Sequence, residues 1–187
     1  MLIGCPIVAV VALVAALLTQ SATGGHPTEA AGARFQLPLA RTELEGTLLP
    51  DLPVRDRSYA PASLPALKGT ATVLTFWATW CSPCVAEMPV FKKLQDAYNG
   101  RLHIAPIAVQ DSRLNIDQWI AKNPQYDFLF LMDGNLGQVK TPLERYFWIQ
   151  GIPVTVFVAA DGRIASIWVG FAGEAALIAK VNALMGR

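Results

Sequence analysis

Residues 70–77 are dominated by β-branched and aromatic side chains, which predicts a central strand buried on both faces of a sheet. Directly after it, apolar residues recur at helical spacing through residues 83–99, at Val85, Met88, Phe91, Leu94 and Tyr98. This spacing predicts a helix that ends at Asn99-Gly100 and is kinked at Pro89. A buried strand that leads straight into a helix is therefore the clearest local unit in the chain.

Shorter apolar segments continue the alternation of strands and helices. Further strands are expected at residues 104–109, 128–132, 154–158 and 164–169. The last two are expected to form an antiparallel hairpin. Helices are expected at residues 116–122 and 174–185, with helix or loop at residues 142–149. Residues 48–56 alternate apolar and polar but contain two prolines, which favours an edge strand or extended arm. This order predicts an α/β fold with a central mixed sheet and helices on both faces.

An uncharged apolar run covers residues 2–18, interrupted only by Gly4, Cys5 and Pro6. At about 17 residues it reaches the lower limit for a membrane-spanning helix and exceeds a usual signal-peptide core. We therefore expect residues 1–20 to be a signal peptide or N-terminal membrane anchor, with a preference for the anchor. Residues 21–45 are expected to be a spacer and residues 46–187 the folded domain, on the extracytoplasmic side of the cell envelope, either anchored or secreted to the periplasm.

Charge is sparse along the 187 residues, since only 16% of them are charged and the net charge is +1. So weak a basic field excludes nucleic acid as an expected partner. A protein partner would instead be recognised through apolar surface and sulfur chemistry. We expect the protein to be a monomer.

Two cysteines stand at the start of the predicted helix, in the sequence Cys81-Ser82-Pro83-Cys84. Residues three apart on a helix share a face, so both can reach the Cα separation of about 5.5 Å that a disulfide tolerates. The unpaired N–H groups and positive dipole end at a helix N-terminus favour a thiolate at Cys81, with a pKa below the usual value of about 8.5. We expect Cys81 to attack a disulfide and Cys84, one turn deeper, to resolve the mixed disulfide.

Other uses of a Cys-x-x-Cys pair fit the sequence less well. A zinc site needs four ligands, and the remaining candidates are Cys5 and two isolated histidines, His26 and His103. Haem attachment needs a histidine directly after the second cysteine, where Val85 stands. A static disulfide that closes so short a loop would add little stability. We therefore expect redox exchange, without a bound metal or cofactor.

Several segments in chain order resemble landmarks of the thioredoxin superfamily. They are residues 76–84 with the cysteine pair, Pro89, Gly151-Ile152-Pro153 and Val169-Gly170. The resemblance covers residues 70–187 and implies a thioredoxin-like fold for the predicted domain. Glu87, Pro50-Asp51 and the N-terminal apolar run narrow it to exported TlpA-like or ResA-like thiol-disulfide oxidoreductases.

This resemblance implies how a substrate is held beside the cysteines. Pro153 would be cis and face the pair, which would leave the backbone of Ile152 exposed to an extended substrate segment, as in strand addition. Trp80, directly before Cys81, is expected to contribute to the substrate-binding surface. Trp148 departs from related chains, which often have a small residue there. It could form an apolar rim with Trp80 and Phe147, but we expect it to pack in the core.

A second departure concerns proton transfer. Thr75 stands where cytoplasmic thioredoxins have a buried aspartate, so that proton acceptor is missing. Glu87, one helical turn after Cys84, is expected to carry protons to and from the resolving thiol instead. The alternative is a structural carboxylate favoured by the helix N-terminus.

The leading hypothesis is a reductase in which Cys81 attacks a substrate disulfide and Cys84 releases the product. The resemblance implies apocytochrome c or another exported protein as substrate, and a DsbD-like or CcdA-like membrane protein as electron donor. Two alternatives would use the same cysteines: a disulfide-forming oxidase and a copper(I)-handling protein of thioredoxin fold. Copper-handling proteins of this kind usually have a different cysteine spacing and an added histidine, and no suitably placed histidine is evident in this sequence.

Overall fold

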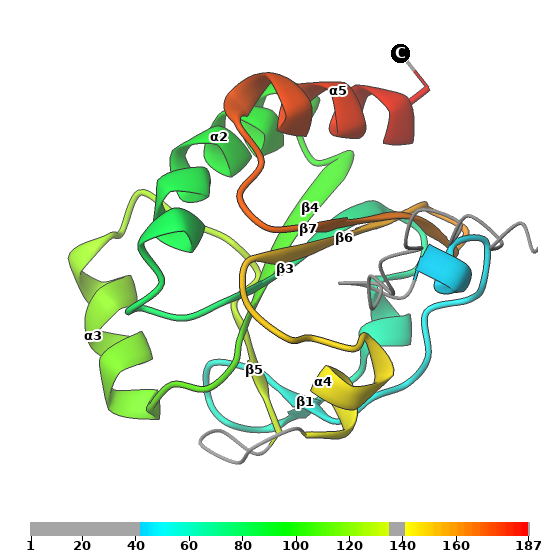
Figure 1. Ribbon diagram of the computed structural model, residues 1–187. Helices are drawn as coiled ribbons and strands as arrows, with labels where there is room; N and C mark the ends of the chain where they lie inside the picture. Colours follow the sequence, from blue (N-terminus) through cyan, green and yellow to red (C-terminus); the bar gives the residue numbers. More distant parts are fainter. Residues whose placement is uncertain (1–41, 135–140, 187) are drawn as a thin grey trace, which may run out of the picture. The chain divides into compact units, whose positions relative to one another are not determined.

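Seven strands form one mixed sheet in the order β2-β1-β5-β4-β3-β6-β7 (Figure 1). The structure, a computed structural model, describes residues 42–134 and 141–186. The strands are β1 (Val54–Arg55), β2 (Pro61–Ala62), β3 (Ala71–Trp77), β4 (Leu102–Ala108), β5 (Leu131–Asp133), β6 (Val154–Val158) and β7 (Ile164–Val169). The α-helices are α2 (Ser82–Tyr98), α3 (Arg113–Lys122), α4 (Pro142–Tyr146) and α5 (Glu174–Leu184). Two short 3-10 helices are η1 (Thr42–Leu44) and η2 (Leu64–Leu67).

β3 is the central strand, and all seven of its residues are buried. It pairs in parallel with β4 on one side and antiparallel with β6 on the other. Its side chains alternate between two apolar cores: Val73 and Trp77 belong to one core, whereas Leu74 and Phe76 belong to the other. The strand therefore joins both layers of the fold and determines where the chain leaves the sheet.

Helices cover both faces of this sheet (Figure 1). Apolar side chains of α2, α3 and α5 pack into the core that contains Trp77. On the other face, Leu143 of α4 and Phe147 join the second core, where the Phe147 ring centroid lies 5.3 Å from that of Phe76. The α/β fold with a mixed sheet between helices, predicted from the sequence, is thereby confirmed.

Most predicted elements are confirmed close to their expected bounds. The β6–β7 hairpin has the predicted limits, and α2 is capped at its C-terminus by Asn99, which adopts a left-handed φ of 43°. Pro89 lies inside α2, and the helix continues on both sides of it. α3 begins earlier than expected because Ser112 caps it: the Ser112 hydroxyl accepts the N–H of Asn115 at 3.2 Å.

The strand expected at residues 128–132 is displaced, since β5 covers Leu131–Asp133. The N–H of Phe130 donates to the carbonyl of Phe128 at 2.9 Å, which makes a tight bend. The Phe128 ring packs against Tyr126 and Phe130, with centroids 5.4 and 5.8 Å away. The N–H of Leu129 still donates to the Ile104 carbonyl of β4 at 3.0 Å, but the regular parallel register with β4 covers only Leu131 and Met132.

The arm ahead of β3 contributes β1 and β2, of which β2 is the edge strand and β1 lies between β2 and β5. Val54 of β1 pairs with Asp133 of β5 and with Ala62 of β2. Further upstream, the Glu45 carboxylate accepts the N–H of Ile167 at 3.0 Å, which attaches this part of the chain to β7.

The predicted anchor at residues 1–20 and most of the predicted spacer lie outside the described residues. Within residues 42–134 and 141–186, no helix combines the length and apolar character needed to cross a membrane. The apolar run at residues 2–18 therefore remains a sequence-based prediction.

Phe157 of β6 is fully buried in the core that contains Trp77. We expect Phe157→Ala to lower the free energy of unfolding by about 3–5 kcal/mol, because the lost ring leaves a cavity that the packed sheet cannot close. Urea denaturation measures this change. Leu114→Ala is the control, since Leu114 is 66% exposed and its loss should change stability by less than about 0.5 kcal/mol. Equal effects of the two substitutions would contradict the described core.

Candidate active site

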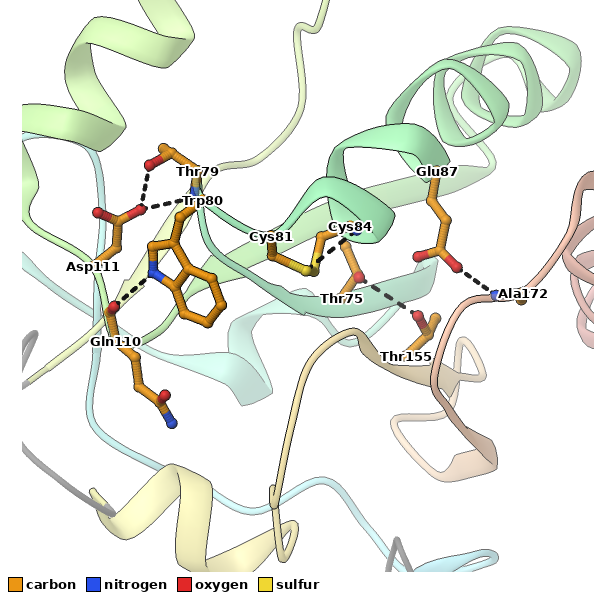
Figure 2. The surroundings of a disulfide bond; sticks show 10 residues. All are labelled: Thr75, Thr79, Trp80, Cys81, Cys84, Glu87, Gln110, Asp111, Thr155 and Ala172. Carbon is orange, nitrogen blue, oxygen red and sulfur yellow. Dashed lines mark hydrogen bonds between the residues drawn. A yellow bond between two sulfur atoms is a disulfide. The ribbon is translucent and has the colours of Figure 1, made fainter.

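The two cysteines form a disulfide at the N-terminus of α2, with a Cα separation of 5.3 Å (Figure 2). Cys81 is the N-cap residue, with extended backbone angles, and Cys84 lies in the first turn. The N–H of Cys84 donates to the Cys81 sulfur at 3.3 Å. Burial of both residues limits their contact with solvent. The Cys81 sulfur thus occupies the position where a capping group meets the unpaired N–H donors of a helix.

This position has a chemical consequence once the disulfide is reduced. A negative charge at a helix N-terminus is stabilised by the dipole and by the N–H groups that point towards it. Cys81 is the cysteine that receives this stabilisation directly, because its sulfur already accepts a backbone N–H. The geometry therefore suits Cys81 to be the attacking thiolate and Cys84 to be the resolving thiol, as the sequence predicts.

A tight turn connects β3 to this helix. The N–H of Cys81 donates to the Ala78 carbonyl at 3.1 Å, so Thr79 and Trp80 form the centre of the turn. Trp80 is 59% exposed, and its indole N–H donates to the carbonyl of Gln110 at 3.0 Å (Figure 2). The turn places a large exposed aromatic side chain directly beside Cys81, as expected for a substrate-binding residue.

Glu87 is a buried carboxyl group, only 1% exposed. Its Oε1 accepts the N–H of Ala172 at 2.6 Å, and Figure 2 shows the side chain extending from α2 towards that residue. Its Oε2 is buried and has no hydrogen-bond partner within the described residues. Burial raises the pKa of Glu87 to about 7, although the bond from Ala172 acts in the opposite direction. The group can therefore gain or lose a proton near neutral pH.

The residue that replaces the buried aspartate of cytoplasmic thioredoxins is uncharged. Thr75 is 1% exposed, and its hydroxyl lies 3.4 Å from the hydroxyl of Thr155 on the neighbouring strand β6. This pair of hydroxyl groups cannot supply a proton acceptor comparable to a carboxylate. Glu87 is the buried carboxyl group on α2, the helix that carries the cysteines.

The Ile152–Pro153 peptide bond is cis, as the resemblance implied. Ile152 packs against the core that contains both cysteines. The Pro153 carbonyl accepts the N–H of Gly170 at 2.9 Å, which extends the β6–β7 pairing by one position. Within the described parts of the chain, neither backbone polar group of Ile152 has a hydrogen-bond partner. Both groups are therefore available to an extended chain laid beside them.

Phe171 belongs to the same surface but was not identified from the sequence. Val154 pairs with Val169 and the N–H of Gly170 donates to the Pro153 carbonyl, so Ile152 directly precedes and Phe171 directly follows the paired ends of β6 and β7. Phe171 is 56% exposed, and the next residue, Ala172, holds Glu87. Its only sequence signal was a large apolar side chain directly after Val169-Gly170.

Trp148 does not pack in the core, contrary to our expectation. It is 37% exposed and has a left-handed φ of 55°. Phe147, by contrast, is completely buried. Because the chain turns at the end of α4 to bury Phe147 and Ile149, the intervening Trp148 is directed outwards. Phe147 therefore cannot contribute to an apolar rim with Trp80.

Gln110 and Asp111 are further residues at the site that sequence reasoning missed. Besides the Gln110 bond to Trp80, the Asp111 carboxylate accepts the N–H and the hydroxyl of Thr79, at 2.7 and 2.6 Å. These residues lie about 30 positions beyond the cysteines, and no local pattern marks them. In the portion of the chain that the structure describes, no group of three or more His, Cys, Asp or Glu side chains could hold a metal ion.

Comparisons with known proteins bear on the family and the fold of the chain. The sequence profile of the Redoxin family matches residues 44–176. Thioredoxin-like protein YneN of Bacillus subtilis is 32% identical over 128 residues, which cover 67% of this chain and 72% of that protein. Thiol-disulfide oxidoreductase ResA of Oceanobacillus iheyensis is 33% identical over 129 residues, which cover 65% of this chain and 63% of that one. The crystal structure of a putative thiol:disulfide interchange protein DsbE from Chlorobium tepidum superimposes with a TM-score of 0.66 over 76% of this chain and 98% of that chain, at 22% identity.

The raised pKa of Glu87 predicts a pH-dependent stability. The pKa is about 7 in the folded protein against a usual value of 4.5, so the unfolded chain releases this proton first as the pH rises. Stability should therefore fall by about 3 kcal/mol between about pH 4.5 and 7, then level off. Glu87→Gln should remove this decline, as measured by urea denaturation across the pH range.

The same substitution tests the proton-transfer role. The rate of disulfide exchange should lose its dependence on a group of pKa about 7 in Glu87→Gln. Glu174→Gln is the matched control, since the Glu174 side chain is exposed and pairs with Lys93 at the surface. An exchange profile in Glu87→Gln that matches the unmodified protein would remove Glu87 from the mechanism.

Proposed function

Because the chain belongs to the redoxin family and is a thiol-disulfide oxidoreductase with a thioredoxin-like fold, we propose that it reduces disulfides of exported proteins in the cell envelope. The observation that carries this proposal is the Cys81–Cys84 disulfide at the N-terminus of α2. Ile152, whose backbone groups have no partner among the described residues, packs against the core that contains both cysteines, and α2 also carries the buried carboxyl group of Glu87. The cysteine pair supplies a nucleophile, the Ile152 backbone supplies a docking site for an extended chain, and Glu87 supplies a proton acceptor.

The reaction begins with the reduced pair. The Cys81 thiolate attacks one sulfur of the substrate disulfide, whose S–S bond breaks as a mixed disulfide forms and the other substrate sulfur leaves as a thiolate. Cys84 then loses its proton and attacks the Cys81 sulfur, which releases the second substrate thiolate. The substrate has gained two electrons, and with two protons it becomes a dithiol. The enzyme has lost two electrons and ends as the Cys81–Cys84 disulfide.

Glu87 serves the second step of this sequence. The resolving thiol must become a thiolate before it can attack, and its proton needs an acceptor in a site from which solvent is largely excluded. A carboxylate on the next helical turn, with a pKa of about 7, can accept that proton and later return it. Burial is what matches the Glu87 pKa to this task, because an exposed glutamate would be too weak a base.

Substrate binding uses backbone groups and apolar contacts together. An extended segment of the substrate, next to its cysteine, pairs with the free N–H and C=O of Ile152. Phe171 and Trp80 contribute exposed aromatic surface, which suits an unfolded or extended apolar segment. Incompletely folded exported proteins, such as apocytochrome c, offer cysteines in this state.

The oxidised pair needs a reductant before the next cycle. We infer that a DsbD-like or CcdA-like membrane protein supplies the two electrons. An N-terminal anchor at residues 1–20 and a spacer at residues 21–45 would keep the domain beside such a donor, on the extracytoplasmic side of the membrane. The apolar run at residues 2–18 supports this arrangement.

The redox state in the native cell envelope tests the direction of the reaction. Alkylation trapping should find the Cys81–Cys84 pair mostly reduced, because a reductase is kept reduced by its donor. Samples treated with dithiothreitol and with diamide define the two extremes, and Cys5→Ser removes the third cysteine from the readout. A pair that is mostly oxidised would contradict the reductase and favour a disulfide-forming oxidase.

Docking at the Ile152 surface predicts a selective effect of Phe171→Ser. The rate constant kcat/KM for reduction of insulin should fall roughly tenfold, since a large apolar contact is lost. Reduction of a small disulfide such as oxidised glutathione should change much less. Leu48→Ser is the matched control, because Leu48 is also 56% exposed but lies by Arg163, near the opposite end of β7. Equal losses with both disulfides would contradict a docking role for Phe171.

A further inference from the structure

The loop that follows β4 runs beside the turn that carries Trp80. The N–H of Val109 donates to the carbonyl of Trp77 at 2.9 Å, at the end of β3. The next two residues of the loop contact the next part of the turn: Gln110 accepts from Trp80, and Asp111 accepts from Thr79. Residues 109–111 are thus hydrogen-bonded to the chain from Trp77, at the end of β3, to Trp80, directly before Cys81. Figure 2 shows the bonds of Gln110 and Asp111.

The buried carboxylate of Asp111 accepts four hydrogen bonds. Oδ2 accepts the N–H and the hydroxyl of Thr79, whereas Oδ1 accepts the N–H of Ser112 at 2.7 Å and the amide of Asn115 at 3.0 Å. The carboxylate is therefore fixed from the side of α3 and from the side of the active-site turn. A neutral asparagine has one acceptor oxygen and could satisfy only one of these sides.

The charge of Asp111 is maintained by the same contacts. Burial by itself would raise its pKa, but the hydrogen bonds from Thr79, Asn115 and Ser112 outweigh burial and lower the pKa below its usual value of 3.8. Asp111 is consequently ionised throughout the neutral range, and its bonds to Thr79 are charge-assisted. Bonds of this kind are about twice as strong as bonds between neutral groups.

Gln110 connects the turn to a second element of the site. Its φ of 51° is left-handed, and while its carbonyl meets the Trp80 indole, its side-chain amide donates to Oε1 of Glu144. Glu144 in turn accepts the N–H of Thr141 at 3.0 Å and completes the capping box of α4. The chain runs from α4 through Phe147 to Ile152. Gln110 therefore links the turn that carries Trp80 to α4, the helix that precedes Ile152.

We propose that Asp111 and Gln110 are positioning residues that hold the Thr79–Trp80 turn. Trp80, Cys81 and the backbone of Ile152 thereby meet a protein substrate in one fixed arrangement. This inference rests on the proposed reduction of protein disulfides. Neither residue touches the sulfur atoms or exchanges a proton in the reaction. Their effect is to place an exposed aromatic side chain and a nucleophile correctly before the substrate arrives, which reduces the loss of freedom on binding.

Asp111→Ala and Thr79→Val test this role. Asp111→Ala removes all four bonds, whereas Thr79→Val removes only the hydroxyl bond and leaves α3 untouched. We expect kcat/KM for insulin reduction to fall about tenfold in Asp111→Ala and about threefold in Thr79→Val, with less than about twofold change for oxidised glutathione. The double variant should match Asp111→Ala alone, because both changes act on one contact.

Two further variants separate positioning from general damage. Thr79→Ser restores the hydroxyl and should restore the rate with insulin. Asp117→Ala removes a carboxylate that lies on α3 with an exposed side chain, where it pairs with Arg113, and should leave both rates unchanged. Urea denaturation of each variant shows whether it remains folded under the assay conditions.

The indole N–H of Trp80 gives a readout that does not depend on the reaction. Its nuclear magnetic resonance signal, assigned by its loss in Trp80→Phe, should be protected from hydrogen exchange in the unmodified chain and lose that protection in Asp111→Ala. Protection that stays the same would overturn the proposal, as would equal losses of rate with insulin and glutathione. If the unmodified protein does not reduce insulin, the proposed function fails, and the Trp80 signal still decides the positioning role.

Discussion

The burial of β3 is the constraint on which the rest of the structure depends. Every residue of this strand is buried, and alternate side chains enter the cores on opposite faces of the sheet. A shift of one residue would exchange the two sets of side chains, so the register of the strand is strongly determined. Because β3 cannot shift, the position of Trp77 is determined, and so are the turn after it and the N-terminus of α2. The location of the Cys81 sulfur at a helix cap therefore follows from the packing of the central strand.

Two buried carboxyl groups near this cap behave in opposite ways, and the number of donors around each explains the difference. Asp111 receives four hydrogen bonds, which lower its pKa despite burial and keep it charged. Glu87 receives one, so burial dominates and raises its pKa to about 7. A charged group with all its acceptors occupied is suited to holding a turn in place. A group poised between its two protonation states is suited to moving a proton.

The surface around the disulfide is assembled from segments far apart in the sequence. Trp80 comes from the turn before α2, Ile152 from the segment before β6, and Phe171 from the segment after β7. The last two flank the end of the β6–β7 pairing, where the N–H of Gly170 donates to the Pro153 carbonyl. The Gln110–Glu144 bond links the turn that carries Trp80 to α4, ahead of Ile152. The two cysteines themselves are buried, whereas Trp80 and Phe171 are exposed. This arrangement favours a partner that arrives as an extended chain.

The sequence by itself determined the elements whose signals are local. The strand before the cysteines, the helix that carries them and the final hairpin could all be predicted, because periodicity, caps and short motifs lie within a few adjacent residues. The cis Pro153 was implied by the resemblance to the thioredoxin superfamily. The sequence could not reveal Phe171, Gln110 or Asp111 as site residues, since their proximity to the cysteines depends on strand pairing across 30 to 90 positions. Only the tertiary structure decided that Trp148 is exposed while Phe147 is buried, because the turn after α4 selects which aromatic ring enters the core. It also decided the protonation of Glu87, because burial by distant segments, rather than the residue type, sets that pKa.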